Sequence, residues 1–113
     1  FGGVGLLMLR GEVWSVALNP TKGSEQEGLR PAVIVSPDSM NKALDTKVVV
    51  PLTSKIKKWP SRVNTDFKNS KGQAMCEQIR TVSSKRLVKN LGILSDGEVV
   101  EVLSVLHALY GQP

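Results

Sequence analysis

The sequence predicts an α+β fold that is mainly β: a compact twisted antiparallel sheet or small barrel with short helical insertions and one C-terminal amphipathic helix. Three observations support this prediction. The chain has 113 residues, which fits one domain. Several short runs rich in β-forming residues are separated by proline, glycine and asparagine. The last part of the chain has apolar residues at helical spacing.

Five segments predict strands. Residues 12–19 (EVWSVALN) alternate in side-chain size, residues 31–36 (PAVIVS) are apolar as in a buried strand, and residues 47–52 (KVVVPL) repeat that pattern. Residues 61–67 predict an edge strand, and residues 73–82 (QAMCEQIRTV) predict one further continuous strand. The sheet is therefore expected to contain at least these five strands.

The intervening segments predict loops and helical turns. Residues 21–30 (TKGSEQEGLR) and 53–60 (TSKIKKWP) are polar and predict exposed loops, and residues 68–72 predict a turn. Residues 38–44 predict one or two helical turns capped by Asp38, and residues 84–89 predict a weak helical turn.

The C-terminal helix has the clearest local signal. Ser95 and Glu98 match a capping box, which satisfies free amides at a helix start. Gly111 is a suitable stop. The apolar stripe consists of Val99, Val102, Leu103, Leu106, Leu109 and Tyr110. This stripe needs an apolar partner surface, which the barrel or a second subunit could supply.

Composition limits the remaining classes of protein. Hydrophobic residues make up 41% and charged residues 22%, so intrinsic disorder is not expected. No apolar run approaches the ~20 residues that span a bilayer, so we expect no membrane association. We expect residues 1–7 to be a non-native or unstructured start, with Met8 as the natural first residue and residues 8–113 as a single domain.

The scarcity of cysteine and histidine restricts the chemistry. The single cysteine, Cys76, excludes an internal disulfide, favours a reducing cytoplasmic setting and predicts a small buried apolar side chain. The single histidine, His107, excludes a paired-histidine acid–base mechanism within one chain. No Cys/His or Asp/Glu cluster predicts a metal site, so we expect no metal or other cofactor.

Positive charge is concentrated in the middle of the chain. The formal net charge is +5, and residues 47–89 contain eleven of the fifteen basic residues but two of the ten acidic ones. Such a cluster is typical of a surface that binds a polyanion such as nucleic acid, although a solvated basic face has the same composition.

Three segments place small polar and charged groups at the ends of predicted strands: GSEQEGLRP (residues 23–31), PLTSKIKK (residues 51–58) and CEQIRT (residues 76–81). Together with RGEVW (residues 10–14), these segments resemble in order and spacing the MazF/PemK (Kid-type) toxins of bacterial toxin–antitoxin pairs. The match covers about residues 10–87 and includes RGEVW (10–14), NPTKGSEQEGLRPAVIVS (19–36), VVVPLTS (48–54) and EQIRT (77–81).

The resemblance implies a small Src-homology-3-like barrel (CcdB/PemK-like) with helices, a homodimer and sequence-selective cleavage of single-stranded RNA. It also implies a cognate antitoxin whose flexible acidic tail occupies the RNA groove, and a toxin–antitoxin complex that binds DNA. Arg30 and Thr53 match catalytic positions of the family, and Glu25 matches a position near the cleaved ribose.

The residues themselves support this chemistry. Cleavage of RNA through its own 2′-OH needs a base, positive charge for the phosphorane and help for the departing 5′-oxygen. The planar fork of Arg30 can clamp phosphoryl oxygens, and Thr53 can donate its hydroxyl to the same phosphate. Glu25 is the candidate base, with Glu77 as the rival carboxylate. The expected products are a 2′,3′-cyclic phosphate and a free 5′-hydroxyl.

Further residues are candidates for RNA binding. Gln26 and Gln78 could read base edges, and Trp59 could stack a base. Lys55, Lys57, Lys58 and Arg62 could hold phosphates. Ser24, Ser54 and Glu77 complete the candidate set: Ser24, Gln26, Ser54, Lys55, Lys57, Lys58, Trp59, Glu77 and Gln78.

The sequence departs from the family pattern around Cys76. In some Kid-like members an arginine and an aspartate flank this cysteine, whereas here the neighbours are Met75 and Glu77. An arginine acid at position 75 is therefore excluded, and Arg30, Arg80 or water would have to assist the departing oxygen.

Alternatives with no chemistry stay open at this level. Arg30 could pair with a loop glutamate, Thr53 could be a turn hydroxyl, and Arg80 could brace the barrel through a buried ion pair. Trp59 could be an apolar plug or a dimer contact. For the whole protein, the alternatives are a non-catalytic nucleic-acid-binding barrel and a CcdB-like poison that acts on a topoisomerase.

Overall fold

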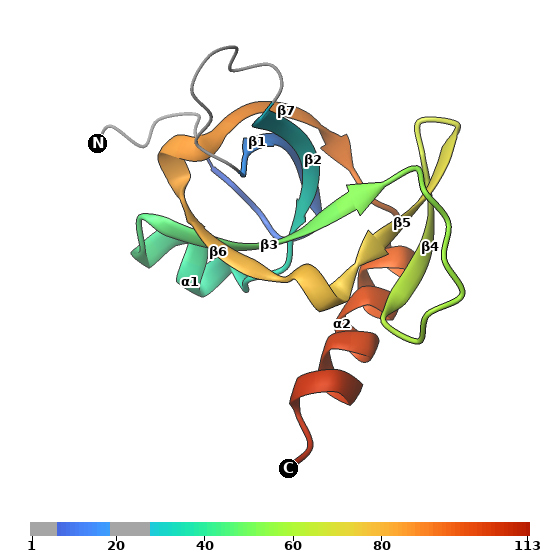
Figure 1. The fold of residues 1–113 in the computed structure, drawn as a ribbon. Coiled ribbons are helices and arrows are strands. Elements are labelled where there is room, and N and C mark those ends of the chain that lie inside the picture. The colour runs from blue at the N-terminus through green and yellow to red at the C-terminus, as the bar shows by residue number, and fades with distance from the viewer. Residues whose placement is uncertain (1–6, 19–27) are drawn as a thin grey trace.

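An antiparallel sheet curls into a small barrel, and one helix packs against its outside (Figure 1). The computed structural model describes residues 7–18 and 28–113. Within them the strand order is β4-β5-β3-β2-β1-β7, with β6 paired to β3. The strands are β1 (Glu12–Ala17), β2 (Leu29–Ile34), β3 (Thr46–Thr53), β4 (Arg62–Phe67), β5 (Ser70–Met75), β6 (Arg80–Ser83) and β7 (Leu87–Ile93).

Two α-helices and two short 3-10 turns complete the described part: α1 (Asp38–Ala43), α2 (Asp96–Tyr110), η2 (Cys76–Gln78) and η3 (Ser84–Arg86). This arrangement confirms the prediction of a mainly β barrel with small helical insertions and a C-terminal helix.

Strand β3 changes partner along one edge, and this change shapes the barrel. Its first half, Thr46–Val49, pairs with β6, and its end, Leu52 and Thr53, pairs with β5. Pro51 lies between the two halves and pairs with Ala32 of β2 on the other edge of β3. The sheet therefore splits at Pro51 and leaves the end of β3 between two diverging surfaces.

The core consists of two apolar clusters. The inner cluster lies within the curl of the sheet and contains Trp14, Val16, Leu18, Ala32, Ile34, Val49, Val82 and Leu87. The outer cluster lies between the sheet and α2 and contains Val13, Val33, Val35, Val50, Leu52, Val63, Ala74, Cys76, Leu94 and Val102. Because strand neighbours point to opposite faces, Val49 and Val50 fall in different clusters.

The local prediction for helix α2 is confirmed. The Ser95 hydroxyl accepts a hydrogen bond from the Glu98 amide, and the Glu98 carboxylate accepts one from the Ser95 amide. The other Glu98 oxygen accepts from the Asp66 amide of β4 at 2.6 Å. The capping box therefore also fastens the helix start to the sheet, and the helix ends at Gly111 as predicted.

The prediction of a single strand over residues 73–82 is wrong. Ala74 pairs with Leu52 and Arg80 pairs with Val49, so six residues on one side match three on β3. The 3-10 turn η2 takes up the three extra residues and separates β5 from β6. Its backbone is held by the Cys76 amide, which donates to the Ser61 carbonyl at 3.1 Å.

Other boundaries differ from prediction as well. The turn expected over residues 68–72 is confined to Lys68 and Asn69, which both have positive φ, and β5 already begins at Ser70. The helical turn expected over residues 84–89 ends at Arg86, and β7 follows it because its pairing with β1 outweighs a weak local preference.

Two further expectations concern the first part of the chain. Asp38 does not cap α1, because Pro37 holds the N-cap position and the Asp38 carboxylate accepts from the Arg10 amide at 2.7 Å. Strand β2 begins at Leu29, so Arg30 lies within a strand. Residues 1–6 of the expected start and residues 19–27, which include most of the expected loop, lie outside the described residues.

Candidate functional site

A groove of about 680 Å³ opens where the end of β3 faces the start of β2, and Arg30 and Thr53 both line it. Ala32 pairs with Pro51, and continuing this antiparallel register by two residues sets Arg30 opposite Thr53. Opposed residues of an antiparallel pair have their side chains on the same face of the sheet. The register therefore explains why these two side chains share a groove.

Strand β6 adds a second guanidinium to the groove. Arg80 pairs with Val49 across β3. Val49 and Thr53 lie four residues apart on one strand, so they point to the same face. Arg80 is exposed and lines the groove with Arg30, although its backbone lies on the other side of β3.

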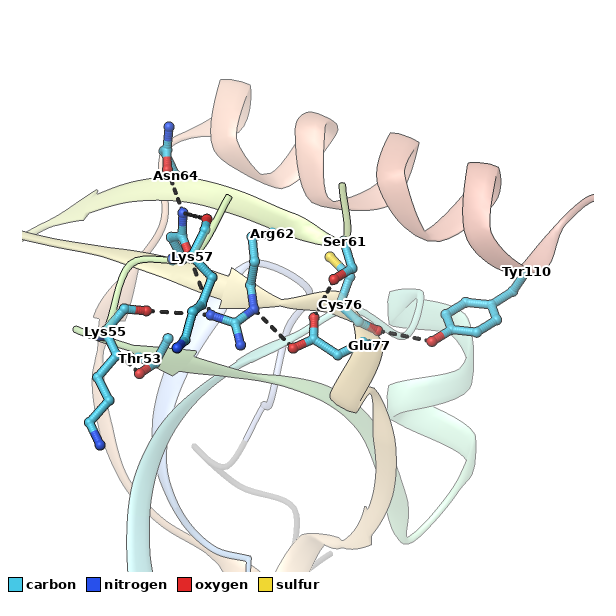
Figure 2. Close-up of polar contacts among 10 residues, drawn as sticks. Thr53, Lys55, Lys57, Ser61, Arg62, Asn64, Cys76, Glu77 and Tyr110 are labelled. Carbon is cyan, nitrogen blue, oxygen red and sulfur yellow. Dashed lines mark hydrogen bonds and ion pairs between the residues drawn. The ribbon is translucent and has the colours of Figure 1, made fainter. Parts of the chain in front are cut away.

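Thr53 is held in place on two sides. Its Oγ1 accepts a hydrogen bond from the Lys55 amide at 3.1 Å, which Figure 2 shows, so the hydroxyl hydrogen can be donated to a ligand. On the other side the backbone of Gly72 lies so close to the Thr53 carbonyl that no Cβ would fit there. The threonine is thus a turn residue, as one alternative held, and also a rigid hydroxyl in the groove.

The groove is positively charged and rich in hydroxyls. Four cationic side chains line it: Arg30, Lys55, Lys71 and Arg80. Four hydroxyl groups accompany them, from Thr53, Ser54, Thr65 and Ser70. Among residues 7–18 and 28–113, no carboxylate lines it. These groups suit a phosphate-bearing ligand, because guanidinium and hydroxyl groups donate hydrogen bonds to its oxygens.

Apart from Glu77 and Arg62, the predicted site residues fall into three groups. Arg30, Thr53, Ser54, Lys55 and Gln78 line the groove. Exposed side chains on the neighbouring loop do not line it: Lys57, Lys58 and Trp59. Three predicted residues lie outside the described residues: Ser24, Glu25 and Gln26.

Glu77 does not face the groove. Its Oε1 accepts from the Ser61 hydroxyl at 2.6 Å and its Oε2 accepts from Arg62 Nε at 2.9 Å (Figure 2). Partial burial opposes ionisation of this carboxyl, but the hydrogen bonds from Ser61, its own backbone and Arg62 outweigh burial and lower its pKa. Both oxygens are engaged in structural contacts, which argues against Glu77 as the base or as an RNA contact.

Arg62 and Arg80 exchange the roles expected for them. The Arg62 side chain is 5% exposed and pairs with Glu77, so it is not available to hold a phosphate. Arg80 has no ion-pair partner among the described residues, so the expected buried brace is formed by Arg62 instead. The sequence could not separate these two arginines, because each lies in the same basic segment.

Sequence reasoning missed Lys71 and the β4 side chains of the groove, Thr65 and Phe67. The sequence predicts a turn at Lys71, whereas this residue lies at the start of β5. The sequence signal that could have found it is Asn69, because Asn is favoured in two-residue hairpin turns, whose residues have positive φ as Lys68 and Asn69 do.

The remaining side chains of chemical interest are not arranged as a site. Cys76 is fully buried in the outer cluster, and burial together with the Glu77 charge raises its pKa to about 11. This confirms the prediction of a small buried apolar residue. In the described part of the chain, no three His, Cys, Asp or Glu side chains gather to hold a metal ion. None of the described helices is long and apolar enough to cross a membrane.

Comparison with known proteins gives consistent relatives. The family of PemK-like, MazF-like toxins of type II toxin–antitoxin systems matches residues 9–110. An endoribonuclease MazF of Staphylococcus saprophyticus is 35% identical over 111 residues, which cover 93% of this chain and 92% of that protein.

Solved structures agree with the fold. A MazF from Deinococcus radiodurans has a TM-score of 0.76 at 25% identity and covers 92% of this chain and 96% of that one. An endoribonuclease from a mycobacterial species, solved with its cognate antitoxin, has a TM-score of 0.79 at 24% identity and covers 93% and 96%. The chain therefore belongs to the PemK-like, MazF-like toxins of type II toxin–antitoxin systems.

Proposed function

We propose that this toxin is an endoribonuclease that cleaves single-stranded RNA by attack of the 2′-OH on the adjacent phosphate, without a metal. The observation that carries the proposal is the shared groove of Arg30 and Thr53, with two further lysines and Arg80 in its lining. The endoribonuclease MazF relative at 35% identity supports the same activity.

The positions of the groove residues suggest a division of labour. Arg30 donates two hydrogen bonds from its planar fork to the scissile phosphate, and Thr53 donates its hydroxyl to the same group. Arg80 lies across β3 from Arg30 and stabilises the charge on the departing 5′-oxygen. The products are a 2′,3′-cyclic phosphate and a 5′-hydroxyl.

Glu25 is the base in this proposal. Glu77 is engaged by Ser61 and Arg62, and no carboxylate of the described residues lines the groove. Glu25 lies outside the described residues but precedes β2 by four positions, which brings it within the segment that leads directly to Arg30. Removal of the 2′-OH proton by a carboxylate needs hydrogen-bond reach to the ribose.

Primer-extension mapping of cuts on a long defined RNA, with and without EDTA, tests the activity. We expect the same cuts in both, and Arg30→Ala and Thr53→Ala should each lower the cleavage rate by about 10²–10³-fold while RNA binding is retained. Lys89→Ala, an exposed cation on β7 that does not line the groove, is the matched control.

The same experiment separates the alternatives. RNA that is bound but never cut would leave a nucleic-acid-binding barrel, and intact RNA together with a blocked topoisomerase would favour the CcdB-like poison. Cleavage that EDTA abolishes would contradict the metal-independent chemistry.

The partners follow from the same proposal. An antitoxin with an acidic flexible tail would complement the cationic groove, and a complex with an antitoxin is known for the mycobacterial relative. We also propose a homodimer in the cytoplasm, where RNA is available. The C-terminal end of helix α2 presents the exposed apolar side chains Leu109 and Tyr110, which a second subunit would cover. Light scattering of the purified toxin measures its subunit number.

A further inference from the structure

We infer that Arg62 is a positioning residue that holds the basic loop beside the groove, rather than a residue that touches RNA. The basic loop is defined as residues 54–60, and it contains Ser54, Lys55, Lys57, Lys58 and Trp59. The inference rests on the proposed function, because it names what places the RNA-binding loop.

The Arg62 guanidinium connects three parts of the chain. Its Nε pairs with Glu77 of η2 at 2.9 Å, and its Nη1 donates to the Lys55 carbonyl at 3.4 Å (Figure 2). The same Nη1 donates to Gln73 Oε1 of β5 at 3.3 Å. The Trp59 ring covers the same guanidinium, with 4.5 Å from Arg62 Cζ to the ring centroid. A planar fork is the side chain that can serve all four contacts at once.

Gln73 fastens the middle of the loop from the other side. Its Oε1 accepts from the Lys57 amide and its Nε2 donates to the Lys57 carbonyl, each at 3.0 Å. Gln73 also pairs with Thr53 across β5 and β3. The buried Gln73 side chain thus pairs with both backbone groups of Lys57, as a neighbouring strand would. This pairing fixes the position of the loop relative to the groove.

These contacts leave the loop's binding groups free. Lys55 and Lys57 contact Arg62 and Gln73 through backbone atoms alone, and Lys58 contacts neither of them. The three lysine side chains are exposed. Trp59 is 49% exposed, with Arg62 Cζ at 4.5 Å and Lys57 Nζ at 5.8 Å from its ring centroid, and its exposed part is accessible to a base. The Thr53 backbone is fixed by its pairing with β5, and only its hydroxyl contacts the loop, through the Lys55 amide. Loss of the loop contacts should therefore affect RNA binding more than the chemical step.

Two variants remove different contacts of the same loop. Arg62→Lys keeps a positive charge beside Glu77 but loses the fork and the ring contact, and Gln73→Ala loses both bonds to Lys57. We expect each to raise the KM for a defined RNA about tenfold, with kcat changed less than about threefold. Lys89→Ala on β7 is the control and should leave both constants unchanged. Thermal unfolding shows whether each variant folds, and either folded variant suffices.

Two readouts do not depend on cleavage. The Lys57 amide should exchange its hydrogen about tenfold faster in Gln73→Ala. The fluorescence of Trp59, identified by its loss in Trp59→Phe, should shift in Arg62→Lys, because the guanidinium no longer covers the ring.

The outcomes separate the two proposals. An unchanged KM in a folded variant, a fall in kcat equal to the rise in KM, or unchanged amide exchange would overturn the positioning role. If the unaltered protein cleaves no RNA, the proposed function fails, whereas exchange and fluorescence still decide whether Arg62 and Gln73 hold the loop.

Discussion

Gly72→Ala should strongly lower the rate of RNA cleavage, although glycine at position 72 carries no functional group. A Cβ at this position would overlap the Thr53 carbonyl oxygen, and it would lie 3.3 Å from the Thr53 carbonyl carbon and 3.7 Å from Ser54 Cα. The φ of Gly72 is outside the left-handed region, so the methyl group alone causes the conflict. All the nearest atoms are backbone, so no flexible side chain can move aside.

The magnitude follows from this geometry. An ordinary contact begins at 3.4 Å, so β5 and the end of β3 must separate by on the order of 1 Å. A shift of that size at a catalytic group can lower the rate about 10²-fold, or about 2.7 kcal/mol of barrier. Overpacking should also lower the free energy of unfolding by about 1–3 kcal/mol.

The assay is single-turnover cleavage of a defined RNA, with urea unfolding in parallel to confirm that the variant is folded. Gly97→Ala is the matched control, because nothing lies within 4 Å of its added Cβ, in the first turn of α2. We expect wild-type cleavage from this control. A folded Gly72→Ala protein that cleaves at the wild-type rate would refute the role of Thr53 placement.

Three further predictions concern stability and reactivity. Ser95→Ala should lower the unfolding free energy by about 1 kcal/mol in urea titrations, since it removes the capping box, whereas Ser104→Ala on the exposed part of α2 should not. Because Glu77 has a lowered pKa when folded, its contribution is present above the unfolded value near 4.5 and is lost as the pH falls through the folded value. Glu77→Gln should thus be less stable than wild type at pH 7 by about 1–3 kcal/mol, and the difference should shrink as the pH falls below 4.5 and through the folded pKa; equal stabilities at pH 7 would contradict this. With a pKa of about 11 against 9.0, Cys76 should hold about a hundredfold less thiolate at pH 8 than an unfolded chain, so a thiol reagent should label it only after unfolding.

The charge of the sequence predicted the kind of ligand, whereas the partners of individual side chains depended on the fold. The concentration of basic residues in the middle of the chain predicts a polyanion surface, and residues on five strands, β2 to β6, line one cationic groove. The partners of Arg62 and Arg80 were not predictable from the sequence, because both arginines lie in the same basic segment, residues 47–89. The two differ only in the side chains that the folded structure places next to each of them. Arg62 forms an ion pair with Glu77 and packs against the ring of Trp59, whereas Arg80 lines the groove.

The sequence by itself determined the elements whose signals are local: the capping box and stripe of α2, the buried runs of β2 and β3, and a small, mainly β domain with one buried cysteine. Only the tertiary structure decided that residues 73–82 break at η2, that β7 forms, and that Arg30 and Thr53 share a face. The physical reason is the separation along the sequence between the residues that interact. Caps and periodicity act between residues a few positions apart, whereas strand partners and ion pairs join positions that the chain brings together only once it has folded.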